Sequence, residues 1–260
     1  MYPYEIVLGM GLYEIMLMLG FFGALLYFRI FADRLGFGAK LQNLVILCAV
    51  SALVSGYGFA VLAQAIYNAL ESGRFEIVND TGATFYGGLI GGAGMFIAIY
   101  FSVGHFRLKP REAVTNFPQL SEIAAGSIAV AHGFGRLGCL FAGCCHGSVT
   151  EEWYGIYHPY IDAKIVPVQL FEALFLFALF GVLTWRLVKG WKNNLAVYLM
   201  AYAVWRFVAE YFRADDRGAT VVSFLSPSQF VAVLLFALGA GLLILAWRRK
   251  KMREDANENA

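Results

Sequence analysis

One stretch of the sequence decides the fold class: residues 167–187, which read PVQLFEALFLFALFGVLTWRL. Its acidic residue is Glu172, and its basic residue, Arg186, stands at the end. A helix of about 20 apolar residues crosses the hydrocarbon core of a bilayer. The stretch therefore predicts a membrane-spanning helix.

The composition of the whole chain agrees with this prediction. Of its 260 residues, 60% are hydrophobic and 15% are charged, and the mean hydropathy is +0.64. Soluble domains are about 45–50% apolar and about 25% charged, so a soluble monomer is excluded. The 16% aromatic content excludes a disordered chain, and a net charge of +2 gives no reason to expect a nucleic-acid partner.

Seven apolar segments are long enough to span a bilayer. We therefore expect an all-α polytopic membrane protein in which residues 1–260 form a single integral-membrane domain and residues 248–260 a charged cytoplasmic tail. The N-terminus lacks the basic residues of a signal peptide. The predicted spans lie near 12–31, 42–66, 85–104, 122–145, 167–187, 195–213 and 228–247.

The basic residues predict the orientation. Fourteen of the 20 lie in alternate loops and the C-terminal tail, after spans one, three, five and seven. The positive-inside rule then puts the N-terminus outside and the C-terminus inside. The opposite loops hold Arg74, Lys164, Arg213 and Arg217, outnumbered by the acids Glu71, Glu76, Asp80, Glu151, Glu152, Asp162, Asp215 and Asp216.

Six ionisable residues lie inside the predicted spans, where a charge is costly. They are candidates for function, although interhelical ion pairs or positions at the water interface are the alternative interpretation. With the predicted orientation, polar groups from five spans converge on the outer leaflet. The six residues are Glu14, Glu122, Arg136, Glu172, Arg206 and Glu210.

Two arginines among these groups predict an anion site, because a guanidinium makes two bonds to one phosphate. The backbone N–H groups of Gly87 and Gly88 are candidates to face the anion at a helix start. Close helix packing is the alternative role for this glycine run, and we favour it for Gly91, Gly92 and Gly94. An anion reached from the outer leaflet points to a phospholipid head group.

Five ordered motifs resemble those of the prolipoprotein diacylglyceryl transferase family. His132-Gly133-Phe134-Gly135-Arg136-Leu137-Gly138 is similar to the family signature. The other four are Tyr86-Gly87-Gly88-Leu89, Pro167-Val168-Gln169-Leu170-Phe171-Glu172, Arg206-Phe207-Val208-Ala209-Glu210-Tyr211-Phe212-Arg213 and Leu225-Ser226-Pro227-Ser228-Gln229.

The resemblance implies an enzyme that moves diacylglycerol from phosphatidylglycerol to the thiol of a lipoprotein precursor. It implies that Arg136 and Arg206 bind the lipid phosphate, that Glu210 neighbours Arg206, and that Tyr13 and Tyr202 line the cavity. Glu122 stands where the family has an acid upstream of its signature. We add to the lipid-binding candidates Gly87, Gly88, Gln169, Glu172 and Arg213.

Three positions depart from the family pattern and put the acceptor in doubt. The family's proposed catalytic His is Tyr86 here, its Asn is Cys139 and its Glu is Cys144. We expect Tyr86 to donate a hydrogen bond to phosphate or glycerol, because its ordinary pKa near 10 makes it a poor base. Glu210, His132 and His146 remain as candidate bases.

The cysteines Cys139, Cys144 and Cys145 have three competing roles besides packing. One could be a nucleophile that carries the lipid, since a nearby cation favours the thiolate. Two could form a disulfide on the oxidising outer side. All three could hold zinc with His146, although C-x4-C-C-H is not a standard zinc pattern. We expect no metal among the site residues and no cofactor.

We therefore expect a diacylglyceryl transferase of the bacterial inner membrane, with its active site facing the outer leaflet. Its partners would be an anionic phospholipid and a lipoprotein precursor or another thiol acceptor. One alternative is a lipid-binding or lipid-moving protein without catalysis. Another is a membrane thiol oxidoreductase that uses Cys139, Cys144 and Cys145. The aromatic loop 147–166 is either an interfacial belt or a lid over the site.

Overall fold

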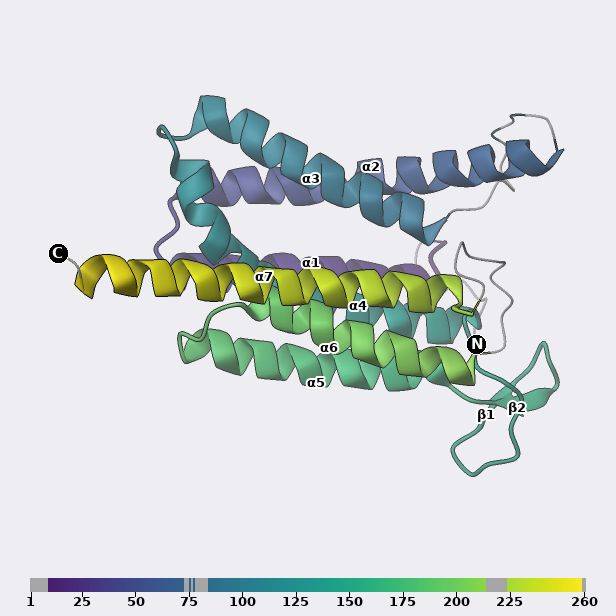
Figure 1. The fold of residues 1–260 in the computed structure, drawn as a ribbon. Helices are drawn as coiled ribbons and strands as arrows, with labels where there is room; N and C mark the ends of the chain where they lie inside the picture. The colour runs from purple at the N-terminus through teal and green to yellow at the C-terminus, as the bar shows by residue number, and fades with distance from the viewer. Residues whose placement is uncertain (1–8, 73–74, 76, 78–83, 214–223, 259–260) are drawn as a thin grey trace. The chain divides into compact units, whose positions relative to one another are not determined.

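The part of the chain that the structure describes folds into seven long helices and one short β-hairpin (Figure 1). The computed structural model describes residues 9–72, 75, 77, 84–213 and 224–258. The elements are α1 (Leu12–Arg34), α2 (Ala39–Ser72), α3 (Phe85–Arg107), α4 (Glu112–Ala142), β1 (Ile156–His158), β2 (Ala163–Ile165), α5 (Val168–Val188), α6 (Asn194–Ala209), the 3-10 turn η1 (Glu210–Phe212) and α7 (Pro227–Glu258).

The all-α fold with seven spanning helices is confirmed. Each of the seven is apolar and long enough to cross a bilayer, so this is a multi-pass membrane protein. Several helix ends differ from the predicted spans: α2 runs from Ala39 to Ser72, α4 begins at Glu112 rather than 122, and α6 ends at Ala209 rather than 213. Helix α4 stops at Ala142 rather than 145 because Gly143 turns the backbone to a φ of 75°. Helix α7 continues to Glu258, so most of the predicted tail is helical.

Several predicted features lie outside the described residues. They are the N-terminal segment 1–8, the side chain of Tyr86, and the loop residues Arg74, Glu76, Asp80, Asp215, Asp216 and Arg217.

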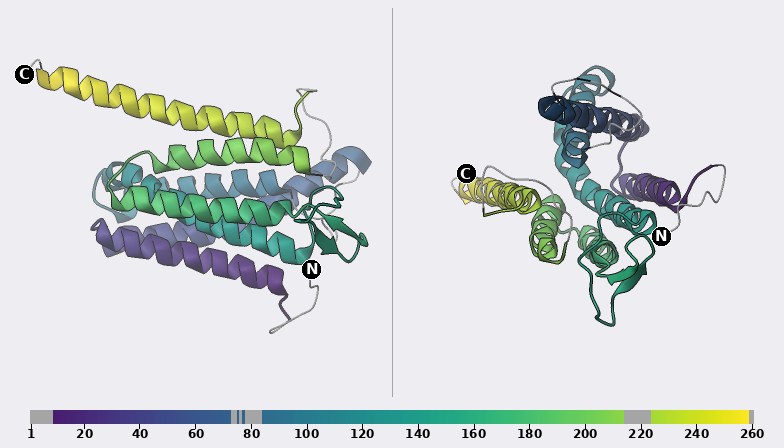
Figure 2. Two further views of the ribbon diagram at one scale, coloured as in Figure 1. Left: turned by 90° about the horizontal axis from the view of Figure 1, so that it is seen from below. Right: turned by 90° about the vertical axis from the view of Figure 1, so that its right-hand side faces the viewer.

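The described chain packs as two compact units, and the first contains residues 1–28 and 120–260. Its helices α5, α6 and α7 run along a common direction, with the hairpin at one end of them (Figure 2). Small residues let α1 and α4 approach closely. A Cβ at Gly20 would lie 3.0 Å from the carbonyl oxygen of Ala131, and the Tyr27 ring occupies the space at Gly126.

The core of this unit lies between α4, α5 and α6. Ala125 and Ala129 of α4 pack there against Leu176 and Leu179 of α5 and the tyrosines of α6. The rings of Tyr198 and Tyr202 are stacked, with centroids 6.0 Å apart. Because these residues repeat every three or four positions, one face of each helix meets the others.

The segment 147–166, which we call the strap, joins the helix ends of the first unit. β1 and β2 pair antiparallel within it, with Ile156 opposite Ile165. Backbone hydrogen bonds from Gly147 to Val166 and from Val166 to Ser148 join the two ends of the strap, and one from Ser148 to Phe212 ties it to η1. Its aromatic residues Trp153, Tyr157 and Tyr160 are exposed.

The second unit contains residues 29–119, and its main contact joins α2 and α3. Glycines of α3 allow this approach. A Cβ at Gly87 would lie 2.5 Å from Cβ of Ala63 and 2.8 Å from the carbonyl oxygen of Phe59. Gly91 and Gly92 also face α2, as predicted, whereas a Cβ at Gly94 would meet nothing within 4 Å.

This contrast gives a matched pair of substitutions on one helix. Gly87→Ala should destabilise the protein by about 1–3 kcal/mol, because the added methyl overpacks against backbone. Gly94→Ala should be neutral or stabilise by up to about 1 kcal/mol, because alanine favours the helix. Thermal unfolding in detergent measures both, and equal effects would contradict the packing described here.

Candidate active site

The site is built on one face of α4, where His132, Arg136 and Cys139 follow one another at helical spacing. Across from them stand Gln169 and Glu172 on α5, both fully buried. Helix α6 contributes Tyr198, Tyr202 and Arg206 at intervals of four, so they also share a face. All of these residues belong to the first unit.

Arg136 and Glu172 form the central ion pair. Nε of Arg136 lies 3.0 Å from Oε1 of Glu172, whose side chain has no exposed surface. The hydroxyl of Tyr202 donates to the same oxygen over 2.9 Å. A charged pair buried this deeply depends on both partners, because either one alone would leave an uncompensated charge.

His132 lies beside this pair and joins it to α6. Its Nδ1 is 3.1 Å from the hydroxyl oxygen of Tyr198, and its Nε2 is 3.8 Å from Oε1 of Glu172. The His132 and Tyr202 rings meet edge to face with centroids 4.7 Å apart. The imidazole thus sits between a phenol and a carboxylate, and it lies within electrostatic range of both Arg136 and Arg206.

Arg206 belongs to a second ion pair, where α6 meets α7. Its Nη2 lies 2.8 Å from Oε2 of Glu210 and donates to Oγ of Ser228 over 2.6 Å. Ser226 donates in turn to Oε1 of Glu210 over 2.7 Å. The second pair therefore fixes the end of α6 to the start of α7.

Arg206 retains one buried donor for a ligand. Within the described part of the chain, its Nη1 makes no hydrogen bond, although the side chain is only 8% exposed. An unsatisfied buried donor is costly, and an anionic oxygen would satisfy it. The geometry around Arg206 therefore suits an anion.

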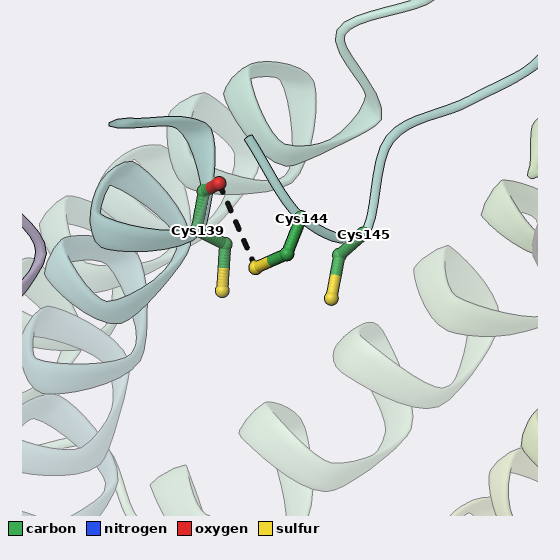
Figure 3. Close-up of side chains that lie close together, drawn as sticks. All are labelled: Cys139, Cys144 and Cys145. Atoms are coloured by element: carbon green, nitrogen blue, oxygen red, sulfur yellow. Dashed lines mark hydrogen bonds between the residues drawn. The ribbon is translucent and has the colours of Figure 1, made fainter. Parts of the chain in front are cut away.

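The three cysteines converge just past the end of α4. Their sulfur atoms all lie within 4.8 Å of one another, and no disulfide joins them (Figure 3). Hydrogen bonds with the Cys139 and Cys144 thiols, and then the nearby Arg213 guanidinium, hold the pKa of the Cys145 thiol well below its ordinary value. The disulfide, one of the roles considered for these cysteines, is not formed in this structure.

The loop that carries two of these thiols is held by buried side chains. The Gln169 amide donates to the carbonyl oxygen of Cys144 over 2.6 Å. Nε2 of His158 lies 3.0 Å from the carbonyl oxygen of Gly143. Gln169 was predicted to bind lipid, but its amide contacts the cysteine loop. In this structure it positions the chain after α4.

Four further lipid-binding candidates are placed as follows. The Tyr13 ring, 37% exposed, packs over Gly138 of the signature. Arg213 lies beside Cys145, and its backbone pairs with Gly147 of the strap. The N–H of Gly88 donates to the carbonyl oxygen of Thr84 over 3.2 Å, which leaves it unavailable to an anion. Gly87, Gly88 and Tyr86 belong to the second unit, and a role for them at the lipid stays a prediction.

Two of the six acids and bases predicted inside spans have structural roles. Both carboxylate oxygens of Glu122 accept hydrogen bonds of 2.7 Å from the backbone N–H groups of Asn193 and Asn194, where α6 begins. Glu14 accepts one from Gly11 at the start of α1. Helix N-termini favour negative charge, so these two acids cap helices.

Comparison with known proteins decides the family. The family model described as prolipoprotein diacylglyceryl transferase matches residues 4–245. The chain belongs to this family. Its resemblance in five motifs, predicted from the sequence, is thereby confirmed, and so is its membership of a transferase family.

Relatives with the same family name are similar to this protein over most of its length. It is 30% identical to phosphatidylglycerol–prolipoprotein diacylglyceryl transferase 2 of Clostridium perfringens, over 99% of this chain and 95% of the relative. A Dehalococcoides mccartyi relative of the same activity is 29% identical over 83% of this chain and 80% of its own. A Clostridium tetani relative is 34% identical over 63% of this chain and 65% of its own.

The structure adds residues that the family motifs alone did not single out. The hydroxyl of Tyr198 is hydrogen-bonded to His132, yet in the sequence Tyr198 is one aromatic residue among many in an apolar segment. Ser226 and Ser228 hold the Arg206–Glu210 pair. Their signal was present, because both stand in the motif Leu225-Ser226-Pro227-Ser228-Gln229 at the start of the last span.

The central pair can be tested by charge removal. Glu172→Gln should cost about 3–5 kcal/mol of stability, because it leaves the Arg136 guanidinium buried without a counter-charge. Thermal unfolding in detergent measures the loss, and Glu152→Gln at an exposed position is the control. Adding Arg136→Gln should cost less than the sum of the two single changes. Strictly additive losses would argue against a direct interaction.

Proposed function

We propose that this protein transfers the diacylglyceryl group of an anionic phospholipid, phosphatidylglycerol or a close analogue, to a thiol of a lipoprotein precursor. Family membership supports the reaction class. The observation that carries the proposal is the arginine pair of the first unit. Arg206 is buried, the Arg136 side chain is only 14% exposed, and both lie within electrostatic range of His132 and Tyr202.

The charge balance around the arginines suits a phosphate. Arg136 and Arg206 face Glu172 and Glu210, so the two pairs are neutral together. A neutral, hydrogen-bonded network keeps the cations in a low-dielectric setting without a ligand. A phosphodiester oxygen would take the free donor of Arg206 and compete with Glu172 for Arg136.

The chemical step follows from this placement. The acceptor sulfur forms a bond to the glycerol carbon that carries the phosphate, and the bond from that carbon to the phosphate oxygen breaks. Glycerol phosphate leaves with the bonding electrons, and the thiol proton passes to a base, for which Glu210, His132 and His146 are the candidates. The arginines stabilise the charge that grows on the leaving phosphate, the kind of interaction that dominates many enzymes.

We place the protein in the bacterial inner membrane, with the N-terminus and the site on the outer side. The orientation rests on the basic residues, which gather in alternate loops. The choice of a bacterial membrane is supported by the relatives, which are bacterial proteins.

The test is lipid transfer by the purified protein in phosphatidylglycerol vesicles, with a peptide that carries one cysteine. Mass spectrometry of the peptide reads out the added diacylglyceryl group. Arg206→Gln should lower the rate by roughly 100-fold or more, because it removes a donor to the developing charge. Arg29→Gln is the control, since Arg29 is 50% exposed and pairs with Asp33.

Full activity of Arg206→Gln would overturn the role of the arginine. Bound phospholipid without transfer by the unchanged protein would instead favour the alternative of a lipid-binding protein that has lost catalysis. Substitution of Tyr86 by His then becomes informative, because it restores the residue that the family has at this position.

A further inference from the structure

We propose that Cys139, Cys144 and Cys145 form a metal site that binds a thiophilic divalent cation, Zn²⁺ foremost, through three thiolates. The site follows from the geometry of the cysteine loop, and it stands whether or not the protein transfers lipid.

The first argument is convergence. The sulfur atoms come from the end of α4 and from two consecutive residues of the following turn, yet all lie within 4.8 Å of one another. The side chains point to the same side of the turn (Figure 3). Three sulfurs bound to one zinc at about 2.3 Å are about 3.8 Å apart. Small side-chain rotations bring the observed cluster to that spacing.

The second argument is that the loop is built to present the thiols. The backbone of Cys145 has a φ of 61°, a left-handed conformation that costs energy in a residue other than glycine. The N–H of Cys144 donates to the carbonyl oxygen of Cys139 over 3.2 Å and closes the turn. Gln169 and His158, both buried, hold the loop from α5 and the strap. Such strain and support are typical of a functional site.

The alternatives account for fewer of these observations. A disulfide would use two sulfurs and leave the third unexplained, and none is formed here. Simple packing favours buried cysteines such as Cys48, whereas Cys144 is exposed and Cys139 and Cys145 are half-buried. A metal ion uses all three sulfurs at once.

The ligand set and its charge select the cation. Thiolates are soft ligands that favour zinc over magnesium or calcium. Three thiolates around Zn²⁺ carry one net negative charge, and the Arg213 guanidinium beside Cys145 opposes it. Binding would release the thiol protons to solvent. His146 is not assigned as a ligand, because among the described residues the group of potential ligand atoms within 4.8 Å of one another contains the three sulfurs and not the His146 ring.

Metal analysis of the full chain tests the proposal. The protein is purified under reducing, anaerobic conditions, incubated with Zn²⁺ and passed over a chelating resin. We expect one zinc per chain by elemental mass spectrometry, and with Co²⁺ in its place a sulfur-to-cobalt charge-transfer band. Cys139→Ser, Cys144→Ser and Cys145→Ser should each lose the band, and Cys48→Ser should keep it.

A second measurement on the unchanged chain avoids dependence on variants that fail to fold. Bound zinc should protect Cys144 from iodoacetamide, and a chelator should restore the reaction. Absence of zinc and of the cobalt band would overturn the proposal. So would a disulfide between any two of the three cysteines under these conditions, or equal loss of the band in Cys48→Ser.

Discussion

The ion pair between Arg136 and Glu172 is the interaction on which the first unit depends. Charges inside an apolar bundle are tolerated only when they are matched and hydrogen-bonded. The need to match the charges holds α4, α5 and α6 next to one another. The pair joins α4 to α5, and the Tyr202 hydroxyl of α6 donates to the same carboxylate. His132 and Tyr198 complete the set from α4 and α6. The residues that satisfy the pair are thus also the ones that line the site.

Four of the six charges inside the membrane segments form two neutral pairs, and the other two cap helices. This division explains how the bundle holds several ionisable groups at tolerable cost. Glu122 accepts hydrogen bonds from the backbone at the start of α6, while Arg206 and Glu210 form an ion pair at its other end. Both ends of one short helix are therefore fixed by charged groups, and Tyr198 and Tyr202 are held in register between them. A rigid α6 is what a site with preorganised donors needs.

The sequence was sufficient to predict the seven helices, the family, and the position of Arg136 and Arg206 inside two of the helices. The length of an apolar segment and the presence of a signature motif are local properties, so they can be read from one sequence without knowledge of the fold. The partners of the charges were not accessible in the same way. Glu122 and Glu172 are both acids in apolar segments, and only the fold assigns one to a helix cap and the other to Arg136. The proximity of the three thiols follows from their spacing in the sequence, whereas the geometry of the cluster depends on the turn at Gly143 and the left-handed backbone of Cys145.

The strap has a mechanical consequence for the helices that it joins. Its backbone hydrogen bonds connect the chain after α4 to the start of α5 and to Phe212 at the end of η1. Spreading these three helix ends would break several hydrogen bonds at once. The strap therefore opposes relative movement of α4, α5 and α6 at this end of the first unit, and these are the helices that carry Arg136, Glu172 and Arg206.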